Sequence, residues 1–125
     1  MKEEVIKLIQ KADHALEVAE ELINNGFPSD SVSKIYYAMF YAAQALLKYE
    51  DIEVKKHSAV ESAIGYHFAK PGRIEPRFHR MFINARNLRE IADYDIQEEI
   101  SESTAEIMLN EGTEFIKTIK IMLKS

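Results

Sequence analysis

The chain has 125 residues and no cysteine, and 46% of its residues are hydrophobic while 30% are charged. These values are typical of one globular domain with its own core, and they exclude a disulfide framework, a thiolate metal site and a cysteine nucleophile. The net charge of −5 argues against a protein that coats nucleic acid or anionic membranes without specificity, because basic side chains supply most of that affinity.

Five segments repeat apolar residues at steps of three and four, which is the spacing of an amphipathic helix. The expected helices span residues 2–25, 29–49, 57–69, 75–92 and 101–124. Gly26 and Pro28 separate the first two helices, and Ser29 or Asp30 is expected to cap the second. Residues 1–125 are therefore predicted to form a single all-α domain, an up-and-down bundle of about five helices.

The later boundaries carry similar signals. Lys70-Pro71-Gly72 is expected to end the third helix, and Glu75-Pro76 is expected to open the fourth, since proline is tolerated in a first turn. Residues 93–99 have weak periodicity and are expected to bend. Ser101 or Ser103 is then expected to cap the last helix.

The helix over residues 29–49 is apolar almost all the way round. At 100° per residue its polar positions fall within about 80° of arc, and they are Ser33, Tyr37, Tyr41, Gln44 and Lys48. A helix that is apolar elsewhere is expected to be surrounded by protein, so this polar stripe faces a partner subunit or a ligand site. In the alternative interpretation, the tyrosines bury their rings and each hydroxyl finds one hydrogen-bond partner.

Arg89 falls close to the apolar face of the fourth helix. Burying an arginine without a partner costs several kcal/mol, because it cannot lose its charge. Arg89 is therefore expected to meet an anion, which is Asp93 one turn on, another carboxylate or a bound phosphate. Arg86 and Glu90 form a second pair at the same spacing and are expected on the plain surface.

The sequence does not predict a metal site. Di-iron helical bundles use Glu-x-x-His on two helices, and this chain contains no such motif. The four histidines, which are His14, His57, His67 and His79, lie on different segments without the spacing of metal ligands. We therefore expect no metal and no cofactor.

Three blocks of sequence together resemble the HEPN domain superfamily, whose name stands for higher eukaryotes and prokaryotes nucleotide-binding. The first block runs from Ser33 to Ala43 (SKIYYAMFYAA) and is similar to the Ser-Arg/Lys-x-Tyr-Tyr-Ala-x-Phe-x-Ala signature. Lys56-His57-Ser58 resembles the opening of the third helix in a compact, single-domain prokaryotic branch. The block from Arg89 to Asp95 (REIADYD) resembles the Arg-x-x-Ala-Asp-Tyr-Asp of that branch.

The resemblance implies an all-α bundle that forms homodimers, with functional residues near the dimer cleft. It also implies a role among toxins or defence proteins, many of which cut RNA without metal through an Arg followed after four to six residues by a His. In that chemistry the histidine exchanges protons and the arginine steadies the phosphate. This chain has Arg89, but Tyr94, Asp95 and Ile96 occupy the positions of the histidine.

No catalytic residue is therefore assigned, and Arg89, His57 and Tyr94 remain candidates. Arg73 and His79 satisfy the motif spacing by count alone, because a loop and a helix start lie between them. Tyrosine has an unperturbed pKa near 10, which does not suit a proton shuttle at neutral pH.

The leading hypothesis is a homodimeric module that binds nucleotide or RNA phosphate without robust catalysis and acts with a nucleotidyltransferase-domain partner, as in a toxin–antitoxin or defence system. Its expected ligand-binding residues are Arg89, Asp93, Tyr94, Ser33 and Tyr37. The second hypothesis is a divergent metal-independent endoribonuclease that uses Arg89 with His57 or Tyr94. The third is a bundle that serves only for dimerisation.

The cytoplasm is the expected location. The first ten residues are amphipathic and of mixed charge, which does not fit a secretory signal. The sequence also contains no apolar run as long as the roughly 18 residues that a membrane-spanning helix needs.

Overall fold

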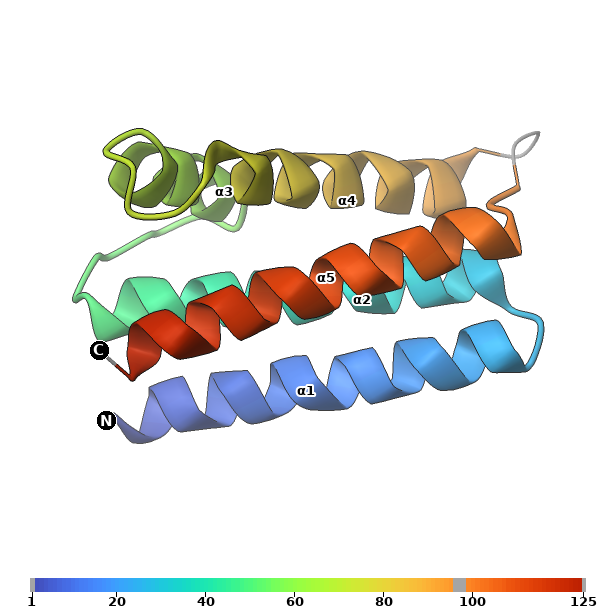
Figure 1. Cartoon of the computed structure of the whole chain (residues 1–125), viewed down its shortest axis with the longest axis horizontal. Helices are drawn as coiled ribbons and strands as arrows, with labels where there is room; N and C mark the ends of the chain where they lie inside the picture. The colour runs from blue at the N-terminus through green and yellow to red at the C-terminus, as the bar shows by residue number, and fades with distance from the viewer. Residues whose placement is uncertain (1, 96–98, 125) are drawn as a thin grey trace.

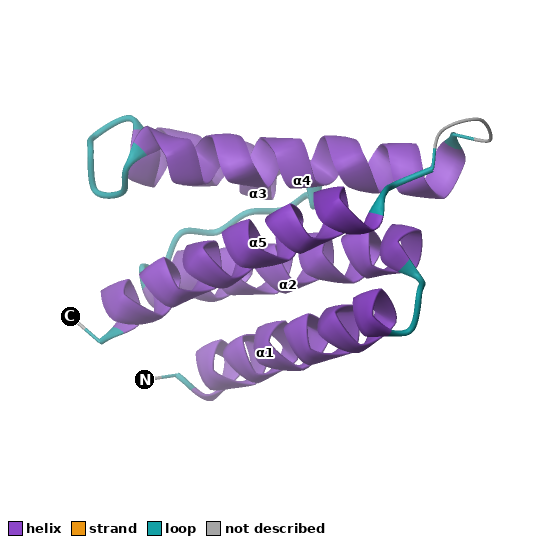
Figure 2. Cartoon of the chain, turned by 45° about the vertical axis from the view of Figure 1, so that its right-hand side comes forward, coloured by secondary structure: helices purple, strands orange, loops and turns teal. Residues whose placement is uncertain are grey.

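The computed structural model describes residues 2–95 and 99–124, and within them it contains helices and no strand. The elements in order are α1 (Glu3–Asn24), α2 (Pro28–Tyr49), α3 (Ser58–Ile64), the π-helical segment η1 (Gly65–Ala69), α4 (Pro76–Tyr94) and α5 (Glu102–Leu123). Figures 1 and 2 both show α2 and α5 side by side, with α1 on one side of them and α3 and α4 on the other. The predicted all-α, up-and-down bundle is confirmed.

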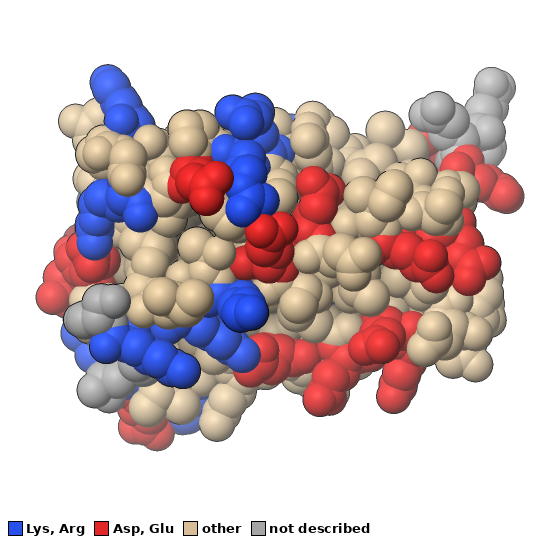
Figure 3. All heavy atoms as spheres, in the orientation of Figure 1, with Lys and Arg blue, Asp and Glu red and all other residues tan. Residues whose placement is uncertain are grey.

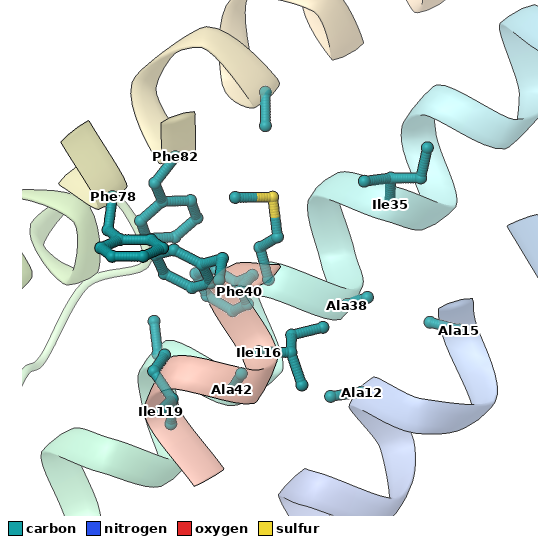
Figure 4. Close-up of a cluster of buried hydrophobic side chains, with 14 of the residues drawn as sticks. Ala12, Ala15, Ile35, Ala38, Phe40, Ala42, Phe78, Phe82, Ile116 and Ile119 are labelled. Atoms are coloured by element: carbon teal, nitrogen blue, oxygen red, sulfur yellow. The ribbon is translucent and has the colours of Figure 1, made fainter. Parts of the chain in front are cut away.

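The central position of α2 follows from its composition. It packs against α1, α5, α4 and α3, and half of its residues are buried, as a helix with apolar residues on nearly every side requires. Small residues on α1, among them Ala12 and Ala15, allow that helix to approach α2 closely (Figure 4). On the opposite side, the ring of Phe82 on α4 lies 5.3 Å from that of Phe115 on α5.

Gly112 lies inside α5, where glycine costs about 1 kcal/mol relative to alanine. A Cβ atom at this position would lie 2.8 Å from Cγ2 of Ile35 and would also touch Met39. The close approach of α5 to α2 therefore explains why a glycine occupies the middle of a long helix.

The caps were predicted correctly for α5 and wrongly for α2. Ser101 caps α5, because its Oγ accepts a hydrogen bond of 3.1 Å from the backbone N–H of Thr104. Phe27 occupies the N-cap position of α2, and Pro28 opens the helix, where its missing N–H is not needed. Neither Ser29 nor Asp30 is the cap. The Oγ of Ser29 instead accepts a hydrogen bond of 3.3 Å from the N–H of Ile100, which ties α2 to the segment before α5.

The third expected helix is continuous but changes its winding, from α-helical to π-helical at Gly65. The ring of His79 lies so close to Gly65 that a Cβ atom there would be 2.6 Å from its Cε1, and Nε2 lies 3.0 Å from the carbonyl oxygen of Glu61. This local contact between α3 and α4 was not apparent from the periodicity.

The fourth helix extends past its predicted end at Ala92 and includes Asp93 and Tyr94. The expected bend over residues 93–99 is therefore wrong for its first two residues, and residues 96–98 lie outside the described part. Within the described residues, no helix combines the length and the apolar character that would let it cross a membrane.

Candidate functional site

The polar stripe of α2 forms the accessible edge of an otherwise enclosed helix. Tyr37 and Lys48 are exposed, and Ser33, Tyr41 and Gln44 are half-buried. Lys34 is exposed beside them, which the prediction of the stripe omitted. The stripe therefore lies at the border of the core, where Tyr37 is accessible to another molecule, Tyr41 packs against the core and Lys48 pairs with Glu4 of α1.

Arg89 reaches this edge from α4. Its Cζ lies 5.1 Å from the ring centroid of Tyr36 and 5.7 Å from that of Tyr37. Both distances suit cation–π attraction, which contributes about 0.5–1 kcal/mol at an exposed site and more where water is excluded. Only 18% of the Arg89 side chain is exposed. The two tyrosines thus hold the guanidinium at the rim of the core.

Asp93 supplies the anion that was predicted one turn on. Nη1 of Arg89 donates a hydrogen bond of 3.1 Å to Oδ2 of Asp93. This pair confirms the expected contact, but the carboxylate is one-third exposed, so its attraction is weakened by solvent.

The Nε–H of Arg89 is buried and has no hydrogen-bond partner within the described part of the chain. A guanidinium offers five donors in a fixed plane, and a buried donor left without an acceptor costs about 1–3 kcal/mol. The protein itself therefore leaves part of the hydrogen-bonding capacity of Arg89 unused.

The charges at the site follow from the same contacts. Burial alone would lower the pKa of Arg89, but the influence of the Tyr37 hydroxyl together with Tyr94 and Asp93 raises it above its usual value. Burial raises the pKa of Tyr36, and the nearby Arg89 opposes this only in part. Arg89 is therefore cationic and Tyr36 is neutral at physiological pH, so Tyr36 is not a general base.

Three of the five predicted ligand-binding residues lie at the end of α4, where Tyr94 is 75% exposed beside Arg89 and Asp93. Tyr37 joins them from α2 through its ring contact with Arg89. Ser33 lies one turn before Tyr37 on the same edge, and within the described residues its hydroxyl forms no hydrogen bond to this group.

The structure does not bring His57 into contact with Arg89. The His57 ring lies 4.9 Å from the ring of Phe40, and Phe40 in turn lies 6.4 Å from Tyr37. Arg73 and His79, the other pair with the motif spacing, do not form a site together. Arg73 donates two hydrogen bonds of 3.0 and 3.1 Å to Glu50, while His79 contacts α3.

The prediction that Arg86 lies on the plain surface, paired only with Glu90, is wrong. Its Nε donates a hydrogen bond of 2.9 Å to Glu61 on α3, in addition to the 3.3 Å contact of Nη1 with Glu90. Arg86 therefore joins two helices, a contact that helical spacing within α4 does not reveal.

A groove between α1 and α2 was also missed. It has a volume of about 550 Å³, and Tyr37 and Tyr41 line it together with Lys11, His14 and Lys34. The spacing of Lys7, Lys11 and His14 along one face of the first helix was the available signal, but only the packing of α1 against α2 brings these side chains beside the tyrosines.

A family model described as HEPN domain matches residues 5–122 of the chain. The chain belongs to the HEPN domain family. Two relatives from Methanocaldococcus jannaschii, both named “Putative toxin” (MJ0142 and MJ0605), are 40% and 36% identical over 124 residues. These alignments cover 99% of this chain and 84% and 92% of the relatives. A “UPF0332 protein” of Gloeobacter violaceus is 33% identical over 111 residues, or 88% of each chain.

Membership confirms the resemblance carried by the three sequence blocks. Within this HEPN domain, the first block provides α2 with its exposed edge and the third provides the end of α4. The blocks are far apart in the sequence, and the fold joins them at the contact between Arg89 and the two adjacent tyrosines.

Proposed function

We propose that this HEPN protein is a homodimeric module that binds a nucleotide or an RNA phosphate at Arg89 and has no robust catalytic activity. The observation that carries the proposal is the buried Nε–H of Arg89, which lacks an acceptor although the guanidinium is held in place by Tyr36 and Tyr37. A phosphate provides several acceptor oxygens and matches the planar donors of arginine.

The side chains around Arg89 favour binding over catalysis. A proton-transfer catalyst needs a group that titrates near neutral pH within hydrogen-bond reach of the reacting atoms. The described neighbours are Asp93, Tyr94 and the two tyrosines of α2, while the imidazole of His57 is separated from Arg89 by aromatic rings. The motif position that carries a histidine in ribonuclease members of the family holds Tyr94, Asp95 or Ile96.

Calorimetric titration with AMP and ATP tests the proposal. Arg89→Ala is expected to weaken binding at least tenfold, since hydrogen bonds to a charged group contribute about 1.5–3 kcal/mol. Arg80→Ala is the matched control, because Arg80 is an exposed arginine on the same helix. Equal affinities in the two variants would refute the site. No binding to the parent at millimolar nucleotide would leave the structural dimer as the remaining function.

The contact of Tyr94 with Arg89 favours a divergent endoribonuclease as the second candidate. Incubation of the parent with mixed RNA in EDTA, beside Arg89→Ala, Tyr94→Phe and His57→Ala, separates it from a binding module. The RNA is expected to stay intact with the parent and with every variant, as judged by gel electrophoresis. Cleavage by the parent that is lost in Arg89→Ala would establish the endoribonuclease instead, and the other two variants would identify its partner residue.

Dimerisation and a toxin role belong to the same proposal. Exposed Tyr37 and Tyr94 flank Arg89, and covering this edge with a second subunit would complete a cleft around it. Light scattering is expected to give twice the monomer mass of 14.4 kDa, and a monomer would contradict the shared cleft.

The names of the two archaeal relatives support a toxin role. The nucleotidyltransferase-domain partner that would hold the toxin in check is part of our proposal and follows from the family resemblance alone. Induced expression in a bacterial host is expected to slow growth. Arg89→Ala should relieve the effect and Arg80→Ala should not. Unimpaired growth with the parent, expressed to the same level as a soluble protein, would count against the toxin role.

A further inference from the structure

The groove between α1 and α2 carries a local positive charge on an acidic protein. The chain carries a net charge of −5, and on the face drawn in Figure 3 the acidic side chains lie mainly over the right-hand half and the basic ones mainly over the left-hand half. The groove is lined by Lys7, Lys11, His14 and Lys34 and by no acidic residue. A concave surface that concentrates positive charge on an acidic protein is suited to a polyanion.

Two of these lysines are available to a ligand. Lys7 is paired with Glu3 at 3.3 Å on the surface of α1. In the described part of the chain, Lys11 and Lys34 make no ion pair, and both are exposed. Lys11 instead places its Nζ 5.4 Å from the ring centroid of Tyr41. The positive charges of Lys11 and Lys34 are therefore not neutralised by an ion pair within the described part of the protein.

The aromatic lining distinguishes among polyanions. Tyr37 is 37% exposed, and its ring lies 6.4 Å from that of Tyr41, one helical turn further along the groove. Unpaired bases stack on tyrosine rings, and each such contact contributes about 1–3 kcal/mol. An acidic polypeptide would use the lysines but would leave the rings without a comparable partner.

Tyr37 also connects the groove to the phosphate site. Its ring lines the groove and lies 5.7 Å from the guanidinium carbon of Arg89. A phosphate bound at Arg89 therefore has the entrance of the groove beside it. Exposed tyrosine rings suit one strand rather than a duplex, because only unpaired bases are free to stack on aromatic side chains.

We propose that the α1–α2 groove binds single-stranded RNA that continues from the phosphate at Arg89, with bases on Tyr37 and Tyr41 and backbone phosphates on Lys11 and Lys34. This inference rests on the proposed function, because Arg89 anchors one end of the strand. It adds the path of the chain and the requirement for an unpaired polynucleotide.

Fluorescence anisotropy with labelled single-stranded RNA of about 12 nucleotides, within the usual range of single-strand site sizes, tests the path. The parent is expected to bind this RNA at least tenfold more tightly than AMP. The double variant Lys11→Gln, Lys34→Gln should lose most of that gain. It should also reduce the magnitude of the slope of log affinity against log salt by about 1.4, since each phosphate contact of a single strand contributes about 0.7. Its affinity for AMP should not change.

The matched control is Lys117→Gln, Lys124→Gln, which removes the same charge from exposed lysines of α5 and its end. Equal loss in both double variants would overturn the groove in favour of a general charge effect. Tyr41→Leu should weaken binding of the oligonucleotide and Tyr41→Phe should retain it, with thermal melting to verify that both fold. A Tyr41→Leu variant that folds and binds like the parent would overturn the stacking role.

The outcomes separate the two proposals. AMP that binds neither parent nor variants would overturn the phosphate site and this inference together. AMP binding that depends on Arg89, combined with an oligonucleotide affinity that does not depend on Lys11 and Lys34, would overturn the groove alone. Displacement of the RNA by polyglutamate as effectively as by unlabelled RNA would identify an acidic protein as the occupant and overturn the RNA assignment.

Discussion

Arg86 and Arg89 lie three residues apart on α4, and their surroundings differ. Arg86 is 36% exposed and meets two carboxylates, Glu61 on α3 and Glu90 on its own helix. Arg89 is only 18% exposed, meets one partly exposed carboxylate and retains a buried donor without an acceptor. The more buried arginine is therefore the one whose hydrogen bonds are less complete, which is the opposite of what stability alone would favour.

Arg77 of α4 resembles Arg86 and differs from Arg89, because it also meets two carboxylates. Arg77, near the start of α4, donates to both Glu75 and Glu114, and these carboxylates raise its pKa. The first part of α4 thus uses arginine to join elements of the fold. Closer to the C-terminal end of α4, Arg89 instead lies against aromatic rings and beside a groove, which is why we propose the ligand site there.

The largest expected effect is a loss of stability at Phe82 of α4, whose ring packs beneath Tyr36 of α2. Phe82 is fully buried between Tyr36, at 5.9 Å between ring centroids, and Phe115. Phe82→Ala should lower the free energy of unfolding by about 3–5 kcal/mol, because it removes apolar contacts and leaves a cavity. Urea denaturation measures the loss. A change below about 1 kcal/mol would mean that the packing beneath Tyr36 is less important than the contacts indicate.

The second prediction concerns Arg89 itself. Arg89→Met keeps the length of the side chain but removes its charge, so nucleotide affinity should fall roughly 10- to 100-fold. The free energy of unfolding without ligand should stay within about 1 kcal/mol of the parent value, because loss of the cation–π contacts is offset by removal of the buried donor. Calorimetry measures the nucleotide affinity, and thermal melting compares the stability without ligand. A strongly destabilised variant with intact binding would reverse our assignment.

Arg86→Ala should show the complementary behaviour with a smaller magnitude. It removes the link between α3 and α4, and because the group is more than one-third exposed, the expected loss of stability is about 0.5–1 kcal/mol. Nucleotide affinity should remain within about twofold of the parent. A larger loss of affinity than that of Arg89→Met would show that Arg86 is the arginine that meets the ligand.

The smallest expected effect is a dependence on alkaline pH. Burial raises the pKa of Tyr36, so the folded state resists its ionisation. The stability that Tyr36 contributes is fully present below the unfolded pKa near 10 and is lost as pH rises through the folded pKa. Urea unfolding at pH 8 and near pH 11 should therefore show a smaller alkaline loss for Tyr36→Phe than for the parent. Equal losses would contradict a buried hydroxyl.

Much of the fold could be predicted from local signals. The periodic apolar residues indicated every helix, and Ser101 was one of the two proposed caps for α5. The errors lie where a distant contact decides. Ser29 does not cap α2 because the helix already begins at Pro28, and its hydroxyl meets Ile100 instead. The third helix changes winding where His79 packs on Gly65.

Only the part of the candidate site that depends on contacts within one helix was predicted. The Arg89–Asp93 pair follows from a spacing of four residues within one helix, and the structure confirms it. The contact of Tyr36 with Arg89 was not foreseen, since α2 and α4 meet only after folding. The contact between Arg86 and Glu61 was missed because the partner lies on another helix.

By itself, the sequence determined an all-α HEPN bundle, a central helix with one accessible edge, and a charged residue at the border of an apolar face. Only the tertiary structure decided which groups surround that charge and which lysines share a groove with Tyr37 and Tyr41. The physical reason is that helical periodicity is a property of neighbours along the chain. Rings, cations and cavities are brought together by the packing of helices that are distant in sequence.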